Sequence, residues 1–259
     1  MLASQEKLTL LPGKKIYFAS DFHLGSPNHE DSLIREKKVV KWLDEIKSDA
    51  QEVYLMGDVF DMWFEYKEVV PRGYTRLLGK LAELSDSGIA LHLFTGNHDM
   101  WIFDYLPKEI GLKLYREPVK REIDGKKFYI GHGDGLGPGD RGYKFIKKVF
   151  ANKICQFLFR WIHPDIGMSM AYFWSRKSRE AAGDNEVIFL GEDKEWLIIH
   201  AKEELKKEAF NYFIFGHRHI PIEVEIAPGS AYVNLGDWIS HFTYAAFNGK
   251  QLSLKKYEN

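Results

Sequence analysis

The stretch Gly-Asp-Val-Phe-Asp at residues 57–61 decides how the rest of the chain is interpreted. It follows the apolar run 53–56, which is typical of a buried strand. Gly57 lets the backbone leave that strand, so Asp58 is expected at its carboxyl end, where open α/β sheets bind their ligands. Alone the motif is weak, because an Asp in a turn usually bonds its own backbone.

Four further stretches of the same kind follow short apolar runs elsewhere in the chain. They are Asp21-Phe22-His23, Gly96-Asn97-His98-Asp99, Gly131-His132-Gly133-Asp134 and Gly216-His217-Arg218-His219. A single Gly-His pair after a strand is more often a packed or hydrogen-bonded histidine than a ligand. Five motifs at five predicted strand ends instead indicate a shared site with two metal ions.

The composition is that of a globular protein. The chain has 259 residues, of which 45% are hydrophobic and 28% charged. A formal net charge of −1 gives no support for nucleic-acid binding, so we predict no nucleic-acid partner. Cys155 is the one cysteine, which favours a reducing compartment. We see neither a signal peptide nor an apolar run of spanning length, so we expect a cytoplasmic protein.

The order of predicted elements changes halfway along the chain. The first part alternates strands at 16–19, 53–56 and 90–94 with helices at 31–47 and 71–85, after a polar lead-in at 1–15. This rhythm predicts parallel strands with crossover helices. The second part has short strands at 112–115, 120–123, 126–130 and 212–215, three or four more within 222–257, and helices within 140–182 and 192–210. We therefore predict one domain, 1–259, with a helical insert at about 138–200.

The candidate metal ligands are carboxylates, imidazoles and one amide. They are Asp21, His23, Asp58, Asn97, His132, His217 and His219. The absence of a thiolate among them favours Mn, Fe or Zn over soft metals. The Asp-x-His and His-x-His spacings place both side chains of each pair on one face of an extended segment. Asp58, on the central strand, is the natural ligand to bridge two ions.

These motifs together resemble the calcineurin-like metallophosphoesterase superfamily. The resemblance spans residues 21–219 and implies an α/β fold of the α+β type, a four-layer αββα sandwich. It implies two divalent ions, with Mn favoured and Fe or Zn as alternatives. By motif position one ion is held by Asp21, His23, Asp58 and His219, and the other by Asp58, Asn97, His132 and His217.

The same resemblance gives catalytic roles to His98 and Asp99. The His of Gly-Asn-His-Asp contacts the phosphate in this superfamily and can protonate the leaving group. Asp99 would orient His98, as carboxylates around metal sites often do. The alternative for His98 is a plain surface histidine.

The predicted insert contains a basic and aromatic segment at 144–162. Its apolar side chains are Val149, Phe150, Ile154, Phe157, Leu158 and Trp161, with Lys147, Lys148, Lys153 and Arg160 near them. Such a segment is typical of one that lies on a membrane surface or binds an acyl chain. The alternative, of about equal weight, is a helix whose apolar face packs onto the sheets.

A second resemblance narrows the substrate. Asp140-x-x-Tyr143, the run Trp174-Ser-Arg-Lys-Ser-Arg179 and Gly57-Asp58-x-Phe60-x-x-Trp63 are similar to the bacterial family of UDP-2,3-diacylglucosamine pyrophosphatases. That family, in the lipid A pathway, hydrolyses the diphosphate to give UMP and 2,3-diacylglucosamine 1-phosphate. It implies a lipid-linked nucleotide substrate and a peripheral position on the cytoplasmic face of the inner membrane. The best-known branch has Arg at the position of His98.

The resemblance also implies which residues contact substrate. The substrate-binding candidates are Asn97, His98, Asp140, Tyr143, Arg176, Lys177 and Arg179, and the acyl-chain candidates in the helical cap are Phe150, Ile154, Phe157 and Trp161. A helix start explains Asp140 equally well, and a solvated face is the alternative for the basic run. Alternative substrates are another nucleotide-diphospho lipid, a soluble nucleotide, a phosphodiester or a phosphoprotein. A scaffold without catalysis is disfavoured because no ligand is missing.

Overall fold

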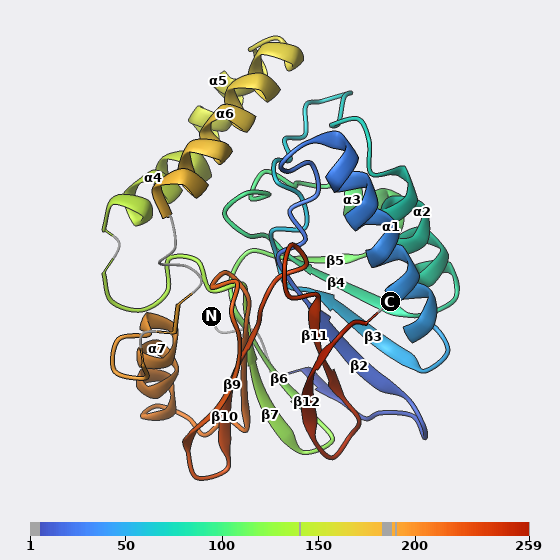
Figure 1. Ribbon diagram of the computed structural model, residues 1–259, viewed down its shortest axis with the longest axis vertical. Helices are drawn as coiled ribbons and strands as arrows, with labels where there is room; N and C mark the ends of the chain where they lie inside the picture. Colours follow the sequence, from blue (N-terminus) through green and yellow to red (C-terminus); the bar gives the residue numbers. More distant parts are fainter. Residues whose placement is uncertain (1–5, 140, 183–187, 190, 259) are drawn as a thin grey trace.

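Two six-stranded mixed sheets form the centre of the protein (Figure 1). The computed structural model describes residues 6–139, 141–182, 188–189 and 191–258. The first sheet has the order β12-β11-β2-β3-β4-β5, in which β2 to β5 are parallel. Its strands are β2 (Lys15–Ala19), β3 (Ala50–Leu55), β4 (Ala90–Phe94), β5 (Lys113–Tyr115), β11 (Thr243–Phe247) and β12 (Leu252–Lys256).

The second sheet has the order β1-β6-β7-β8-β10-β9. Its strands are β1 (Glu6–Leu8), β6 (Val119–Ile123), β7 (Lys126–Ile130), β8 (Tyr212–Phe215), β9 (Pro221–Ala227) and β10 (Ser230–Leu235). Strands β7, β8 and β10 run parallel to one another. Strand β6 pairs antiparallel with β7 and parallel with β1, and β9 pairs antiparallel with β10. The parallel strands of both sheets therefore end at sheet edges that can carry a shared site.

The alternation of side chains along the strands builds the layers. In β2, Phe18 packs into the core between the sheets, whereas Tyr17 packs toward the helices. Helices α1 (His29–Ile46), α2 (Thr75–Asp86) and α3 (Tyr105–Ile110) cover the outer face of the first sheet, and α7 (Trp196–Leu205) covers that of the second. Because both faces of the inner strands are buried, their sequences are mainly apolar. The four-layer αββα prediction is confirmed.

Three helices from the range of the predicted insert stand at one end of the sandwich (Figure 1). They are α4 (Arg141–Ala151), α5 (Lys153–Arg160) and α6 (Pro164–Ala182). Asn152 separates the first two, because its side chain caps the amides of Ile154 and Cys155. A small aromatic cluster joins these helices to the sandwich, with Phe159 packed against Phe64 and Trp101.

The predicted start of the second helix at Pro71 is wrong. The helix begins at Thr75, because Tyr74 has a left-handed backbone with φ 57°. Its first free amides, those of Arg76 and Leu77, are capped by the carboxylate of Glu36 from α1, at 2.9 and 3.0 Å. Strand β1 within the supposed lead-in and helix α3 were not expected, and the helix predicted at 192–210 is shorter.

Two glycines provide a matched test of backbone conformation. Gly79 lies exposed inside α2, whereas Gly88 follows that helix with φ 84°, and a Cβ on either would meet nothing within 4 Å. We expect Gly79→Ala to raise the free energy of unfolding by about 0.5–1 kcal/mol. Gly88→Ala should lower it by about 1–2 kcal/mol, because L-residues disfavour this conformation. Urea denaturation measures both values, and equal effects would contradict the account.

Candidate metal centre

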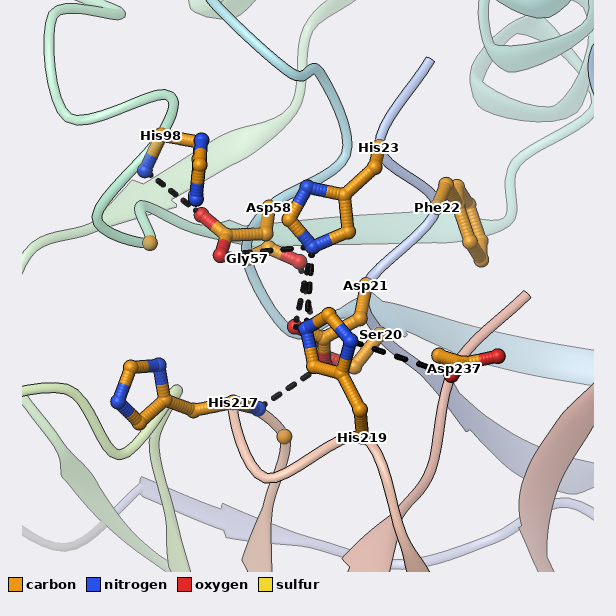
Figure 2. A network of polar contacts seen from close by, with 12 residues as sticks. Ser20, Asp21, Phe22, His23, Gly57, Asp58, His98, His217, His219 and Asp237 are labelled. Atoms are coloured by element: carbon orange, nitrogen blue, oxygen red, sulfur yellow. Dashed lines mark hydrogen bonds and ion pairs between the residues drawn. The ribbon is translucent and has the colours of Figure 1, made fainter. Parts of the chain in front are cut away.

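The candidate ligands meet where strand ends of both sheets face each other (Figure 2). Asp21, Asp58 and Asn97 follow β2, β3 and β4 of the first sheet, and His132 and His217 follow β7 and β8 of the second. Backbone hydrogen bonds link these loops directly. The amide of Asp21 donates to Gly57 O at 3.1 Å, and the amide of Gly216 donates to His132 O at 2.9 Å.

The backbone is strained at most of these positions. Five of the seven predicted ligands have a left-handed conformation: Asp21 (φ 57°), His23 (43°), Asp58 (50°), His217 (68°) and His219 (52°). Such a conformation costs about 1–3 kcal/mol for a residue other than glycine and persists only where the surroundings enforce it. The concentration of strain at one place is typical of a functional site.

Two glycines of the motifs are required because the carboxylates of Asp58 and Asp21 lie very close to their backbones. A Cβ on Gly96 would lie 2.2 Å from Asp58 Oδ1, and a Cβ on Gly216 would lie 2.5 Å from Asp21 Oδ2. Both distances are far below van der Waals contact. The glycines therefore let the loop backbones approach the two carboxylates, which explains why Gly precedes the polar residues of these motifs.

One ligand cluster contains Asp21, His23 and His219, whose candidate donor atoms all lie within 4.8 Å of one another. The two imidazole Nε2 atoms are 3.2 Å apart, and Asp21 Oδ1 lies 3.3 Å from His219 Nε2. Asp21 and His23 are buried, and the side chain of His219 is 14% exposed. Three donors thus converge on one point, and His219 is the most exposed of them.

A second cluster contains Asp58, His132 and His217, again within 4.8 Å. Asp58 Oδ2 lies 3.4 Å from His132 Nε2 and 3.8 Å from His23 Nε2, which places this carboxylate between the clusters. Asn97 Oδ1 lies 3.4 Å from His132 Nε2. The structure therefore brings together all seven residues that the sequence singled out.

The donor sets fit two divalent cations. Oxygen and imidazole donors without thiolate suit Mn, Fe or Zn. Asp21 Oδ1 is buried and has no hydrogen-bond partner among the described residues, as expected of an oxygen whose partner is an ion. His132 Nδ1 faces Met56 O at 2.8 Å, which leaves Nε2 to face Asp58.

The pKa values of the candidate ligands are shifted by burial and by neighbouring charges. Burial favours the neutral acid, but the neighbouring imidazoles, led by His132, outweigh it and hold the pKa of Asp58 well below its ordinary value. Burial lowers the pKa of His217 to about 4, so its imidazole is neutral near pH 7. Although burial opposes it, the charge of Asp58 raises the pKa of His132 to about 10. A cation would replace that proton.

The surroundings of His98 differ from the prediction. Its Nδ1 lies 2.9 Å from Ser175 Oγ and 3.1 Å from Asp61 O. Asp99 does not contact this ring, because its carboxylate accepts the amides of Gly96 (2.7 Å) and Val59 (2.8 Å). Asp99 therefore ties two site loops together instead of orienting His98. Burial raises the pKa of Asp99 to about 7, with the charge of Asp58 adding to the shift.

Several supporting residues were missed from the sequence. Arg35 of α1 donates to the carbonyl of His23 at 2.9 Å, and Glu195 forms a buried ion pair with Arg218 at 2.9 Å. Asp237 lies 3.9 Å from His219 Nδ1 (Figure 2). Only Arg218 lies inside a motif; the others come from distant segments whose sequence gives no metal-site signal.

A cavity of about 520 Å³ opens beside the metal centre, between α4, α6 and the sandwich. It is lined mainly by apolar side chains, among them Trp101, Phe150 and Trp174. Of the predicted substrate-binding residues it is bordered by Asn97, His98, Tyr143 and Lys177. Arg176 is exposed outside the lining, while Asp140 and the side chain of Arg179 lie outside the described residues.

The acyl-chain candidates divide into two groups. Phe150 lines the cavity. Ile154, Phe157 and Trp161 are 68%, 57% and 78% exposed and lie outside its lining. The basic, aromatic segment at 144–162 is therefore not one stripe with one partner, because Asn152 splits it into two helices with different faces.

Comparisons with known proteins show the family of this chain. A family model for calcineurin-like phosphoesterases matches residues 14–221. A Porphyromonas gingivalis protein named UDP-2,3-diacylglucosamine hydrolase is 39% identical over 95% of this chain and 98% of its own length. A Yersinia enterocolitica protein of the same name is 26% identical over 73% of this chain and 78% of its own. The solved Escherichia coli phosphoesterase YfcE is 14% identical, with a TM-score of 0.45 over 93% of this chain and 92% of its own.

Fold and site together define a hydrolase of phosphoesters that uses divalent metal ions. The chain belongs to the calcineurin-like phosphoesterase family.

Asp58 provides the sharpest test of the two clusters, because it lies between them. We expect Asp58→Asn to weaken Mn²⁺ binding by about 100-fold or more, since even residues that only support a metal ligand are worth 10–100-fold. Asp86→Asn, at an exposed position of α2, is the control. Calorimetric titration of chelator-treated protein measures both, with circular dichroism to confirm folding. Unchanged Mn²⁺ affinity in the folded Asp58 variant would contradict the placement.

Proposed function

We propose that this protein hydrolyses the diphosphate of UDP-2,3-diacylglucosamine to UMP and 2,3-diacylglucosamine 1-phosphate, a step of lipid A biosynthesis. The observation that carries the proposal is the apolar cavity that borders both the metal centre and the helices α4 and α6. A nucleotide-diphospho lipid needs a polar reaction centre and an apolar chamber side by side. The relatives named for this activity support the same choice.

The metal ligands follow the two clusters. One ion would be held by Asp21, His23, Asp58 and His219, and the other by Asp58, Asn97, His132 and His217. Two divalent cations would withdraw charge from a bound diphosphate and make water a stronger nucleophile near neutral pH. Mn²⁺ is the preferred candidate, with Fe²⁺ or Zn²⁺ as alternatives.

His98 is the candidate catalytic residue. It borders the cavity and lies beside the metal centre, with its ring centroid 4.9 Å from that of His23. Its imidazole would contact the phosphate and help to discharge the leaving group. The backbone amide of His98 donates to Asp58 Oδ1 at 2.8 Å, which fixes the ring's segment to the metal centre.

Tyr143 and Lys177 would contact the polar part of the substrate from the cavity rim. Tyr143 is held by Asp134, whose Oδ2 accepts its hydroxyl at 2.5 Å. Lys147 joins the same carboxylate at 2.7 Å. Helices α4 and α6 would thus form a cap whose cationic and hydroxyl groups bind the polar part of the substrate and whose aromatic groups contact the lipid.

A soluble nucleotide or a phosphoprotein is a weaker candidate substrate. Either would predict an insert packed against the sandwich with no chamber of acyl size. The cavity of about 520 Å³ is instead open and mainly apolar. Another nucleotide-diphospho lipid would fit the same chamber.

The direct test measures UMP release. Chelator-treated protein supplied with Mn²⁺ should release UMP from detergent-solubilised UDP-2,3-diacylglucosamine, and not without metal. Asp58→Asn should be inactive. UDP-N-acetylglucosamine, which lacks the acyl chains, should be a poor substrate. Hydrolysis of simple phosphodiesters without UMP release from the lipid would refute the substrate and leave the family intact.

Substitutions of two phenylalanines can distinguish binding of the acyl chain in the cavity from binding on the surface of the cap. Phe150 lines the cavity, and Phe157, on α5, is 57% exposed. We expect Phe150→Ala to raise KM for the detergent-solubilised lipid about tenfold or more, because about 1.5–3 kcal/mol of apolar burial is lost. Phe157→Ala should leave that KM nearly unchanged. Neither should alter KM for bis(p-nitrophenyl) phosphate. Equal effects of the two variants on the lipid would contradict an acyl chain in this cavity.

The exposed apolar residues of the cap suggest a second role, peripheral attachment to the cytoplasmic face of the inner membrane. Leu158 and Trp161 are 60% and 78% exposed, with Lys153 and Arg160 exposed beside them. None of the helices in the described ranges combines the length and apolar content needed to cross a bilayer. An aromatic and basic surface of this kind suits the boundary of an anionic membrane.

Two equally exposed leucines test this attachment. Leu158 of α5 is 60% exposed, and Leu11, far from the cap in sequence, is 61% exposed. We expect Leu158→Glu to weaken binding to phosphatidylglycerol-containing vesicles about tenfold, since it loses apolar burial and adds a repelled charge. Leu11→Glu should not change it. Vesicle sedimentation measures both, and equal losses would exclude the cap as the attachment surface.

A further inference from the structure

The ring of His98 is held by a helix of the cap. Its Nδ1 faces Ser175 Oγ of α6 at 2.9 Å and the carbonyl oxygen of Asp61 at 3.1 Å. Ser175 Oγ in turn donates to Asp61 Oδ2 at 3.1 Å. Because the hydroxyl proton is directed to the carboxylate, its oxygen is available to accept from the ring.

These partners determine which ring nitrogen carries the proton. A carbonyl oxygen can only accept, so its position opposite Nδ1 favours a proton there. The hydrogen-bonded chain then runs from His98 Nδ1–H to Ser175 Oγ–H and on to Asp61 Oδ2. With Nδ1 engaged in this way, Nε2 is the nitrogen left to interact with a substrate.

The chain joins three separate parts of the fold. His98 follows β4, Asp61 follows β3, and Ser175 lies on α6, 77 residues after His98. All three residues are buried. Ala171 and Trp174, on the same helix, line the apolar cavity together with His98. The helix that borders the lipid chamber is therefore also the helix that contacts the candidate catalytic ring.

We propose that Ser175 is a positioning residue that orients His98 for the hydrolysis proposed above, so that catalysis depends on the placement of α6. The proposal rests on the proposed function for its kinetic consequence, but the contact itself does not. Ser175 contacts the ring at Nδ1, so it can act through His98, and it also lines the cavity itself.

The kinetic test uses Ser175→Thr and Ser175→Val, which differ only in a hydroxyl against a methyl group. We expect Ser175→Val to lower kcat for UDP-2,3-diacylglucosamine about tenfold with little change in KM. This lies at the lower end of the 10–100-fold typical of orienting residues, since the Asp61 carbonyl still faces the ring. Ser175→Thr should retain most of kcat. Ser169→Ala, on an exposed position of α6, should match the wild type.

The second readout is independent of activity. Two-dimensional ¹⁵N–¹H spectra of the imidazoles in metal-free protein, assigned with His98→Gln, should show His98 protonated on Nδ1 in the wild type and in Ser175→Thr. Ser175→Val should shift the ring toward a mixture of tautomers. Identical ring signals in all three proteins, or equal kcat for the Thr and Val variants, would overturn the proposal.

The two tests also separate this proposal from the proposed function. If wild-type protein with Mn²⁺ released no UMP, the substrate would be wrong, and the ring spectra would still decide whether Ser175 orients His98. If UMP were released equally by all three proteins, the substrate would stand and the role of Ser175 would fall.

Discussion

The position of Asp58 between two groups of imidazoles is the constraint on which the site depends. Its Oδ2 lies 3.4 Å from His132 Nε2 and 3.8 Å from His23 Nε2, and the residue is 1% exposed. A buried carboxylate is costly unless positive charge surrounds it. The clusters on either side supply that charge when they hold protons or metal ions. The strained loops, the close glycines and the buried Arg218–Glu195 pair all serve to keep these groups together.

The sandwich and the cap helices supply different parts of the site for the proposed reaction. The sandwich supplies rigid strand ends and the donors for cations, whereas α4 and α6 supply an apolar chamber and the rim residues Tyr143 and Lys177. Such a division lets a common phosphoesterase centre act on an unusual substrate, because the fold alone does not set specificity. The contact between Ser175 and His98 lies where the sandwich and the cap meet.

Much of the fold could be predicted because its inner strands are short apolar runs in the sequence. The predicted strands at 90–94, 126–130 and 212–215 coincide with β4, β7 and β8, because the buried part of each strand is mainly apolar. Strand β1 was missed because it is three residues long and two of them are charged. The start of α2 was misplaced because its cap, Glu36, comes from another helix.

The site, like the fold, could be predicted from the sequence only in part. The seven candidate ligands could be named because each follows a strand within a short motif, and their convergence follows from the parallel strand order. The role expected for Asp99 was wrong, because neighbours in sequence need not touch: it binds backbone amides, and Ser175 takes the place beside His98. Hydrophobic periodicity likewise could not tell Phe150, inside the chamber, from Phe157, on the surface.

The most direct test of the central claim is electron paramagnetic resonance of chelator-treated protein loaded with two equivalents of Mn²⁺. If Asp58 joins the two clusters, the ions lie about 3.5–4 Å apart and must couple magnetically, giving a broad multiline spectrum. The account predicts that spectrum. A simple six-line signal of isolated Mn²⁺ at full occupancy would contradict it.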